Sequence, residues 1–311
     1  MANATTYTAE TWPIAACMHG FDPIGADGTP MHDAPASTWA AVFAEVQSLG
    51  FNALEISDGH IRIAELSDSR RSELVSIADD HGITLTSLHV ARQSVIMPGH
   101  EAKNLEYAHR SIEACAAMGI PMFSTGLHQP FTQAQKDALW FWTAQGPIDP
   151  DDAAVRKTAV DRIRELGNHA ADLGLQMSLE MYEDTYLGTA DSAVQFIEEV
   201  GLSNVGLNPD IGNLVRLHRP IEDWQEMYAK TLPYANYWHL KNYARDEAGD
   251  GSWFTAVPST LELGLINYRK VIRDALALGY SGVFLMEQYG GDSLGVCATN
   301  ARYVRSLLPR A

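Results

Sequence analysis

Four residues in the second half of the chain have the side-chain types and spacing of a metal-binding site. Glu180, Asp210, His239 and Glu287 each end, or closely follow, a short apolar run. An acid at the end of a strand buried on both faces is costly in the core but well placed at the mouth of a parallel sheet. A single acid or histidine after an apolar run is a helix cap about as often as it is a site residue. Four of them, after four successive apolar runs of strand length, favour a common site. They predict one divalent ion, with Mn²⁺ first and Mg²⁺ or Co²⁺ as alternatives.

The elements that must position these residues alternate between strands and helices along the whole chain. Apolar runs of strand length are followed by amphipathic patterns of helix length, and several of these patterns end at a glycine. The predicted strands cover 11–18, 51–56, 83–90, 120–124, 175–180, 205–207, 235–239 and 282–287, and the predicted helices cover 37–49, 69–80, 101–118, 151–173, 189–200, 221–232, 266–278 and 293–308. Such alternation indicates parallel βα units.

Eight units in one chain fit a single (β/α)₈ TIM barrel, which typically needs about 250 residues before insertions. An open doubly wound sheet is the alternative. We favour the barrel because the polar strand ends come from successive units, whereas an open sheet concentrates its ligands at one switch point. The glycine-rich nucleotide-binding motifs do not occur, and no linker marks a second domain. The prediction is therefore an α/β protein with one TIM-barrel domain over residues 1–311.

The charge and cysteine content of the chain indicate which partners it can bind and in which compartment it is found. The 311 residues carry a formal net charge of −17, which disfavours nucleic acid because binding to backbone phosphates needs clustered Lys and Arg. The three cysteines lie far apart, which argues against a disulfide framework. No secretion signal or membrane-spanning run is apparent in the sequence. We therefore expect a cytoplasmic protein that binds neither nucleic acid nor membrane.

The longest irregular stretch runs from about 127 to 150, after the fourth predicted strand. It holds His128 near the strand end and four aromatic residues, Phe131, Trp140, Phe141 and Trp142. A loop of this length in a compact barrel is often functional. We expect the rings either to line the mouth, where they would suit a flat aromatic group, or to form a short helix that plugs the barrel wall.

Short motifs around the four strand ends resemble those of the xylose-isomerase-like barrel superfamily, which includes sugar isomerases, ketose 3-epimerases, inosose dehydratases and endonuclease-IV-type enzymes. The motifs are Ser178-Leu-Glu-Met-Tyr, Gly206-Leu-Asn-Pro-Asp-Ile-Gly-Asn, Trp238-His-Leu-Lys and Leu285-Met-Glu-Gln-Tyr. The βα rhythm extends the resemblance over nearly the whole chain. It implies one divalent metal ion held by the four strand-end residues.

Two positions depart from the ketose 3-epimerases of this superfamily. Those enzymes usually have a histidine three residues after the strand-six Asp and an arginine soon after the strand-seven His, whereas this chain has Asn213 and Lys241-Asn242. An ordinary free-ketose epimerase is therefore in doubt. The endonuclease branch needs additional histidine ligands, and although His89 and His128 lie near strand ends, the acidic charge opposes DNA binding. His89 is instead expected to line the mouth.

The aromatic loop resembles the corresponding loop of the α subunit of bacterial C-glycoside deglycosidases. This resemblance implies a metal-dependent lyase that removes the proton next to the carbonyl of an oxidised (3-keto) C-glycoside and then splits the carbon–carbon bond to the aglycone. It also implies a smaller β subunit, which could cover an otherwise exposed patch of rings. The catalytic residues would be His128 as the base, Glu180, Glu287 and Lys241, and the substrate would contact His89, Asn213 and Trp140.

Two other functions use the same residues. A ketose or keto-sugar isomerase or 3-epimerase begins with the same proton removal at the same metal, with Glu180 or Glu287 as the base in place of His128. A sugar-binding barrel without catalysis is the remote alternative, because an ion-binding quartet in an open mouth is hard to justify for binding alone. In every case the expected partner is a small sugar or glycoside.

Overall fold

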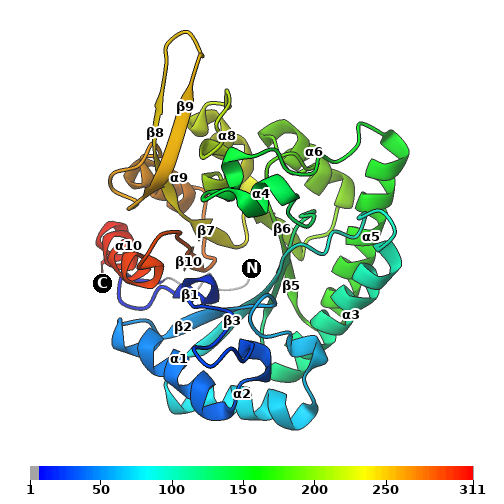
Figure 1. Ribbon diagram of the computed structural model, residues 1–311, viewed down its shortest axis with the longest axis vertical. Helices are drawn as coiled ribbons and strands as arrows, with labels where there is room; N and C mark the ends of the chain where they lie inside the picture. The colour runs from blue at the N-terminus through cyan, green and yellow to red at the C-terminus, as the bar shows by residue number, and fades with distance from the viewer. Residues whose placement is uncertain (1–6, 311) are drawn as a thin grey trace.

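The computed structural model describes residues 7–310, and its centre is a sheet of eight parallel strands (Figure 1). The strands are β1 (Ile14–Cys17), β2 (Ala53–Ser57), β3 (Thr84–Val90), β4 (Met122–Thr125), β5 (Gln176–Glu180), β6 (Val205–Asn208), β7 (Trp238–Leu240) and β10 (Phe284–Met286). Their order in the sheet is β6-β5-β4-β3-β2-β1-β10-β7. Nearly all of their residues are buried, as expected for strands covered on both faces. The TIM-barrel prediction is confirmed.

The sheet closes into a barrel at a seam between β6 and β7, where pairing is sparse. One isolated bridge joins Leu207 to Ala235 across the seam. A side chain adds to it, because Asn208 Oδ1 accepts the backbone N–H of His239 at 2.8 Å. An amide side chain therefore substitutes for part of the missing backbone ladder, next to two of the predicted metal ligands.

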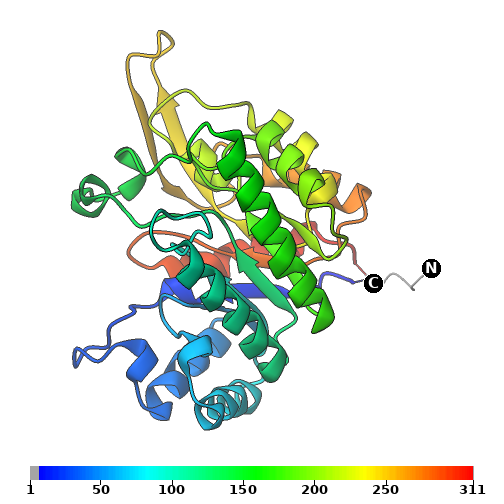
Figure 2. The ribbon, with the colours of Figure 1, turned by 90° about the vertical axis from the view of Figure 1, so that its right-hand side faces the viewer.

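Helices cover the outside of the barrel (Figures 1 and 2). The longer ones are α1 (Ala36–Ser48), α2 (Asp68–Asp80), α3 (Glu101–Met118), α5 (Ala153–Asp172), α6 (Ala190–Val200), α8 (Trp224–Thr231), α9 (Tyr268–Ala277) and α10 (Ser293–Leu307), while α4 (Gln133–Asp137) and α7 (Gly212–Val215) are short. Side chains of Ser67, Asp152 and Thr189 accept N–H groups in the first turn of the helix that each precedes. None of the described helices is both long and apolar enough to cross a membrane.

An antiparallel hairpin, β8 (Asn242–Glu247) and β9 (Phe254–Ser259), was not expected from the sequence. It projects far from the barrel directly after β7 (Figure 1). In the turn that connects its two strands, Gly251 has a φ of 72°, which favours glycine. Figure 2 shows the described ends of the chain on one side of the barrel, with the hairpin and the loop at 127–150 on the other.

The predicted element boundaries are mostly within three residues of the observed ones. Helix α3 matches its prediction, and the largest deviations lie at the starts of β1, β7 and α8. The seventh strand begins at Trp238 and not at Ala235, because Leu232–Tyr234 forms a 3₁₀-helix after α8. The first strand begins at Ile14 and not at Thr11, because Thr11 and Trp12 belong to a turn closed by bonds to the Thr8 carbonyl.

Candidate metal centre

The four residues predicted to bind a metal meet at the carboxyl end of the barrel. Glu180 is the last residue of β5, Asp210 lies two residues beyond β6, His239 lies within β7, and Glu287 directly follows β10. All four side chains are buried. Each offers one ligand atom within 4.8 Å of those of the other three. We call these four residues the quartet.

Two cationic side chains contact the carboxylates of the quartet. His239 Nδ1 lies 2.9 Å from Glu287 Oε2, 3.8 Å from Glu180 Oε1 and 3.9 Å from Asp210 Oδ2. Lys241 Nζ lies 2.6 Å from Asp210 Oδ2 and 2.9 Å from Glu287 Oε1. Lys241, predicted to be catalytic, is thus buried and bonded to two of the quartet residues.

Gly212 makes room for the lysine. A Cβ at this position would lie 2.5 Å from Lys241 Cγ, closer than real Cβ contacts, and 3.0 Å from Asp210 Oδ1. Lys241 therefore reaches Asp210 because residue 212 has no side chain.

Burial and neighbouring charges together set the protonation of the quartet. Burial raises the pKa of Asp210 to about 7, although Lys241 opposes this shift. Burial also acts on Glu287, but Lys241 and His239 hold its pKa well below its usual range. Burial disfavours the charged form of His239, yet Glu55 and Glu287 raise its pKa well above the usual value. The three carboxyl groups of the quartet outnumber the two cationic side chains, His239 and Lys241. A divalent cation would offset this excess of negative charge.

The donor set of the quartet fits such an ion. Carboxylate oxygens and an imidazole nitrogen are ligands of Mn²⁺, Mg²⁺ and Co²⁺. Asp210 Oδ1 is buried and has no hydrogen-bond partner among residues 7–310. Buried polar atoms rarely lack a partner, and a bound ion can take the place of a hydrogen-bond donor. The quartet is therefore a candidate site for one divalent cation.

His89 and His128 lie against Glu180. Their Nε2 atoms are 3.1 Å and 3.3 Å from Glu180 Oε2, and the ligand atoms of the three residues lie within 4.8 Å of one another. Burial lowers the pKa of His128 to about 3, so its ring is neutral near neutral pH. Its Nδ1 has no hydrogen-bond partner within the described part of the chain. His128 thus offers a nitrogen that no other side chain occupies.

Asn213, predicted to contact the substrate, lies beside the quartet. Its Nδ2 donates to Glu180 Oε1 at 2.8 Å and to the carbonyl of Met181 at 2.9 Å. The amide group therefore orients Glu180. A contact between Asn213 and the substrate stays a prediction.

A cavity of about 640 Å³ is lined by residues at or after the ends of β1, β2, β3 and β10 and by residues of the long loop. His19 in its wall is 6.1 Å from His89, measured between ring centroids. The cavity is also lined by Asp58, Arg92, Phe131, Phe141 and Tyr289. Two rings of the long loop therefore line the mouth, as one of the two sequence-based expectations proposed.

The rest of the aromatic loop packs on a buried ion pair. Arg216 Nη2 donates to the two carboxylate oxygens of Glu183 at 3.2 Å and 3.1 Å. The guanidinium carbon of Arg216 lies 4.7 Å from the ring centroid of Phe141 and 5.3 Å from that of Trp142. Trp140 is half-buried and stacks on Trp142 at 4.9 Å. Trp142 is buried, so the four rings do not form one exposed patch.

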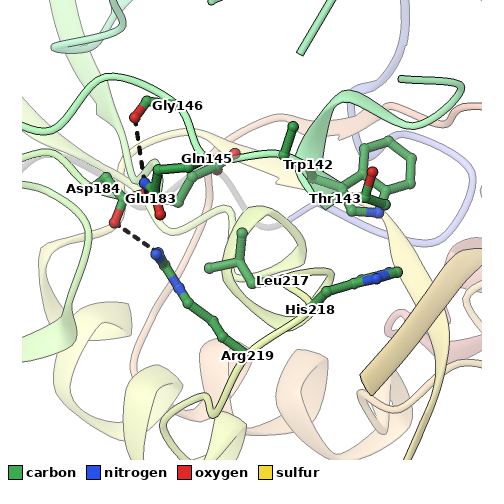
Figure 3. A pocket seen from close by; sticks show the side chains of 10 residues that line it. Trp142, Thr143, Gln145, Gly146, Glu183, Asp184, Leu217, His218 and Arg219 are labelled. Carbon is green, nitrogen blue, oxygen red and sulfur yellow. Dashed lines mark hydrogen bonds and ion pairs between the residues drawn. The ribbon is translucent and has the colours of Figure 1, made fainter. Parts of the chain in front are cut away.

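A smaller hollow of about 280 Å³ lies under the same loop (Figure 3). Asp184 forms part of its wall and accepts from Arg219 Nη2 and Gln145 Nε2, each at 2.7 Å. The quartet residues do not line this hollow.

Glu55 is a residue of this centre that the sequence reasoning missed. It lies within β2, is fully buried, and its Oε1 is 3.3 Å from His239 Nε2. The signal that could have found it is a single acid inside the apolar run 51–56. Such an acid is costly to bury without a partner.

Comparisons with known proteins agree with this geometry. The chain is 24% identical to a D-psicose 3-epimerase of Agrobacterium fabrum over 266 residues, which cover 81% of each protein. It is also 24% identical to a D-psicose 3-epimerase of Enterocloster bolteae over 274 residues, which cover 85% of this chain and 81% of the relative. A crystal structure of a xylose isomerase-like TIM barrel protein from Mycobacterium smegmatis, in complex with magnesium, is 47% identical, with a TM-score of 0.92 and coverage of 97% of this chain and 98% of that one.

These relatives favour the epimerase alternative over the carbon–carbon lyase. Two of the three are named as epimerases, and none of the three is named as a C-glycoside deglycosidase or as part of a complex with a smaller subunit. The family described as xylose isomerase-like TIM barrel matches residues 43–307. This chain, with its strand-end quartet, belongs to the xylose isomerase-like TIM barrel family.

Proposed function

We propose that this protein is a divalent-metal-dependent enzyme that epimerises or isomerises a keto sugar, starting with removal of the proton next to the carbonyl group. The observation that carries the proposal is the buried quartet, together with a cavity of about 640 Å³ that has room for a small sugar. Tyr289 in the cavity wall connects the two, because its ring centroid lies 5.6 Å from Lys241 Nζ. The epimerase names of the relatives support the same reaction class. A divalent cation in the quartet, with Mn²⁺ as the first candidate, would polarise the carbonyl oxygen and stabilise the enediolate.

We assign proton transfer to two residues on opposite sides of the barrel, His128 and Glu287. His128 follows β4 and Glu287 follows β10, and in the strand order β10 is the fourth strand from β4 in either direction once the seam is closed. Inverting a carbon requires removal of its proton from one face and delivery of a proton to the other. His128 Nδ1 would take the first proton, and the neighbouring Glu180 carboxylate would stabilise the imidazolium that forms. Glu287 would serve the opposite face. Because its own carboxyl group is held unprotonated, the proton delivered there would come from the Lys241 ammonium group, whose Nζ lies 2.9 Å from Glu287 Oε1.

Other residues of the cavity would bind the sugar and exclude water. The Arg92 guanidinium lies 3.7 Å from the ring centroid of Phe131 and donates to the Tyr182 hydroxyl at 2.7 Å. Arg92 also has a φ of 61°, a strained conformation that is common at functional sites. Its remaining N–H groups are suited to sugar oxygens. Lys241 would hold a substrate oxygen close to the quartet.

The C-glycoside lyase is a second candidate, favoured by the rings of Phe131, Phe141 and Tyr289 in the cavity wall. These rings suit a flat aromatic group attached to the sugar. After the same proton removal, the enolate would expel the aromatic group with the electron pair of the carbon–carbon bond. The departing carbon would then take up a proton.

One experiment separates these reactions. Metal-stripped protein, with and without added Mn²⁺, is incubated in D₂O with a free ketose and, in parallel, with a 3-keto C-glucoside. We expect Mn²⁺-dependent deuterium incorporation at the carbon next to the carbonyl, together with an epimeric or isomeric sugar, detected by NMR. Release of the aglycone would instead assign the lyase. Absence of deuterium exchange and of aglycone release with both substrates would contradict the proposal.

A further inference from the structure

The two ring nitrogens of His239 face different partners. Nδ1 points toward the carboxylates of the quartet, with Glu287 Oε2 at 2.9 Å. Nε2 points toward Glu55, whose Oε1 and Oε2 lie 3.3 Å and 3.4 Å away. Both side chains are fully buried, so water does not compete for this contact. Glu55 is outside the quartet, but it touches one of its members.

We propose that Glu55 is a positioning residue of the metal centre, which keeps a proton on Nε2 of His239 and so makes Nδ1 the nitrogen that binds the ion. The inference rests on the proposed metal site. As a carboxylate, Glu55 can only accept hydrogen bonds, so the Nε2 atom that faces it must carry a proton. Without the ion, Nδ1 also faces a carboxylate, Glu287 Oε2 at 2.9 Å, and so also carries a proton. When the ion replaces the Nδ1 proton and Nε2 keeps its own, the ring is neutral and the lone pair of Nδ1 faces the other three ligands.

A chain of hydrogen bonds fixes Glu55 in turn. Ser87 Oγ donates to Glu55 Oε2 at 2.8 Å, and the Tyr237 hydroxyl lies 2.6 Å from Ser87 Oγ. Because the Ser87 proton is directed at Glu55, Tyr237 must be the donor to Ser87. The chain therefore runs in one direction, from Tyr237 through Ser87 to Glu55, and each of its protons has an acceptor. This arrangement leaves Glu55 little freedom to turn away from His239.

The backbone of His239 is held as firmly as its ring. Its N–H donates to Asn208 Oδ1 at 2.8 Å, across the seam of the barrel. Glu55 fixes the ring from one side and Asn208 fixes the main chain from the other. Carboxylates that bind the second nitrogen of a metal-bound histidine orient the ring and raise its basicity, and their loss typically weakens metal binding about 10–100-fold.

Glu55→Gln tests this role with little change in volume. A glutamine has one acceptor end and one donor end, so it cannot accept from His239 and Ser87 on separate atoms as the carboxylate does. If its amide N–H faces His239, the ring proton stays on Nδ1, where it blocks the ion. We therefore expect Mn²⁺ affinity to fall about 10–100-fold, measured by calorimetric titration of metal-stripped protein.

Glu183→Gln is the matched control. It also replaces a buried glutamate in an ion pair, but the partner is Arg216 and not a member of the quartet. We expect it to lower the melting temperature and to leave Mn²⁺ affinity within about twofold of wild type. Nitrogen-15 spectra of the Mg²⁺-loaded wild type should show the His239 proton on Nε2. In Glu55→Gln this signal should be lost or moved.

The outcomes are distinct. Unchanged Mn²⁺ affinity in a folded Glu55→Gln protein would overturn the inference, and so would an equal loss of affinity in Glu183→Gln, because the effect would then be general destabilisation. Neither result depends on turnover. Wild-type protein that binds Mn²⁺ but exchanges no substrate proton would contradict the proposed reaction and leave the role of Glu55 intact. Wild-type protein that binds no Mn²⁺ would overturn both.

Discussion

Lys241 Nζ lies 2.6 Å from Asp210 Oδ2, in a part of the barrel from which solvent is excluded. The ammonium group is therefore an internal counter-ion for a carboxylate that is also a predicted metal ligand. A bound divalent cation would lie close to this ammonium group and be repelled by it. We therefore expect Lys241 to stabilise the metal-free protein and to oppose binding of the ion.

Replacing Lys241 with methionine should separate these two effects. We expect Lys241→Met to bind Mn²⁺ at least about tenfold more tightly than wild type, because loss of a nearby positive charge removes repulsion in a site of low dielectric constant. The metal-free variant should unfold at a lower temperature, because Asp210 and Glu287 lose their buried partner. Calorimetric titration and thermal unfolding measure the two effects. Lys230→Met, at an exposed lysine that pairs with Asp191, is the control and should change neither. Weaker Mn²⁺ binding by Lys241→Met would show that the lysine supports the ion.

Asp210 is the quartet member with an unpaired buried oxygen, so replacing it should reduce the amount of metal that the protein binds. We expect Asp210→Ala, purified and dialysed against trace Mn²⁺, to contain well under one equivalent of metal by elemental analysis. Asp246→Ala removes an exposed carboxylate on the hairpin and should retain the wild-type content. Full stoichiometric metal in the Asp210 variant would show that the ion binds elsewhere.

His128 is the proposed proton acceptor, and its replacement should affect the rate more than metal binding. We expect His128→Ala to lower kcat about 10²–10⁴-fold, the usual effect of losing a general base, with metal content unchanged. Because burial lowers the pKa of His128 to about 3, protonation of this ring should not limit the rate of wild type above about pH 5. Near-wild-type turnover in the variant would move the role to Glu180 or Glu287.

Asp149 ties the end of the aromatic loop to the segment after β5, and it should make stability depend on pH. It accepts from Tyr186 N at 3.0 Å and from Gln129 Nε2 at 3.1 Å, and burial raises its pKa to about 6. The folded state therefore binds this proton more tightly than the unfolded state. The stability gained from it is complete below about pH 4 and is lost as the pH rises through 6.

Asp149→Asn removes this titration. The difference in the free energy of unfolding between the variant and wild type should therefore change between pH 4 and pH 7, by at most about 3 kcal/mol. Urea unfolding at several pH values measures it, with the exposed Asp151→Asn as the control. A difference that stays constant over this range would contradict the assignment.

Strand-end positions were the part of this site that could be predicted from sequence. Glu180 and Glu287 each end an apolar run, and parallel strands in a barrel carry their last side chains to a common mouth. Glu55 escaped prediction because it lies within a strand, where alternation alone suggests a surface position. Only the closed barrel reveals that its side chain points inward at His239, a contact between residues 184 positions apart.

The hairpin and the packing of the aromatic loop could not be predicted from the sequence either. Residues 242–259 are polar enough to read as a loop, and the glycines at 249 and 251 were the available hint of a hairpin turn. Within the aromatic loop, sequence could not decide which rings would be buried. That depends on Arg216, whose guanidinium group packs against Phe141 and Trp142 from a different βα unit.

The sparse pairing between β6 and β7 has a consequence for motion. A barrel with a single backbone bridge at one seam should open there first, and amide hydrogens along Val205–Asn208 and Trp238–Leu240 should exchange with solvent faster than those of β2 and β3. Asp210 and His239 lie on opposite sides of this seam. An ion bound by both Asp210 and His239 would link the two sides of the seam. Hydrogen exchange along the seam would therefore slow as the metal concentration rises.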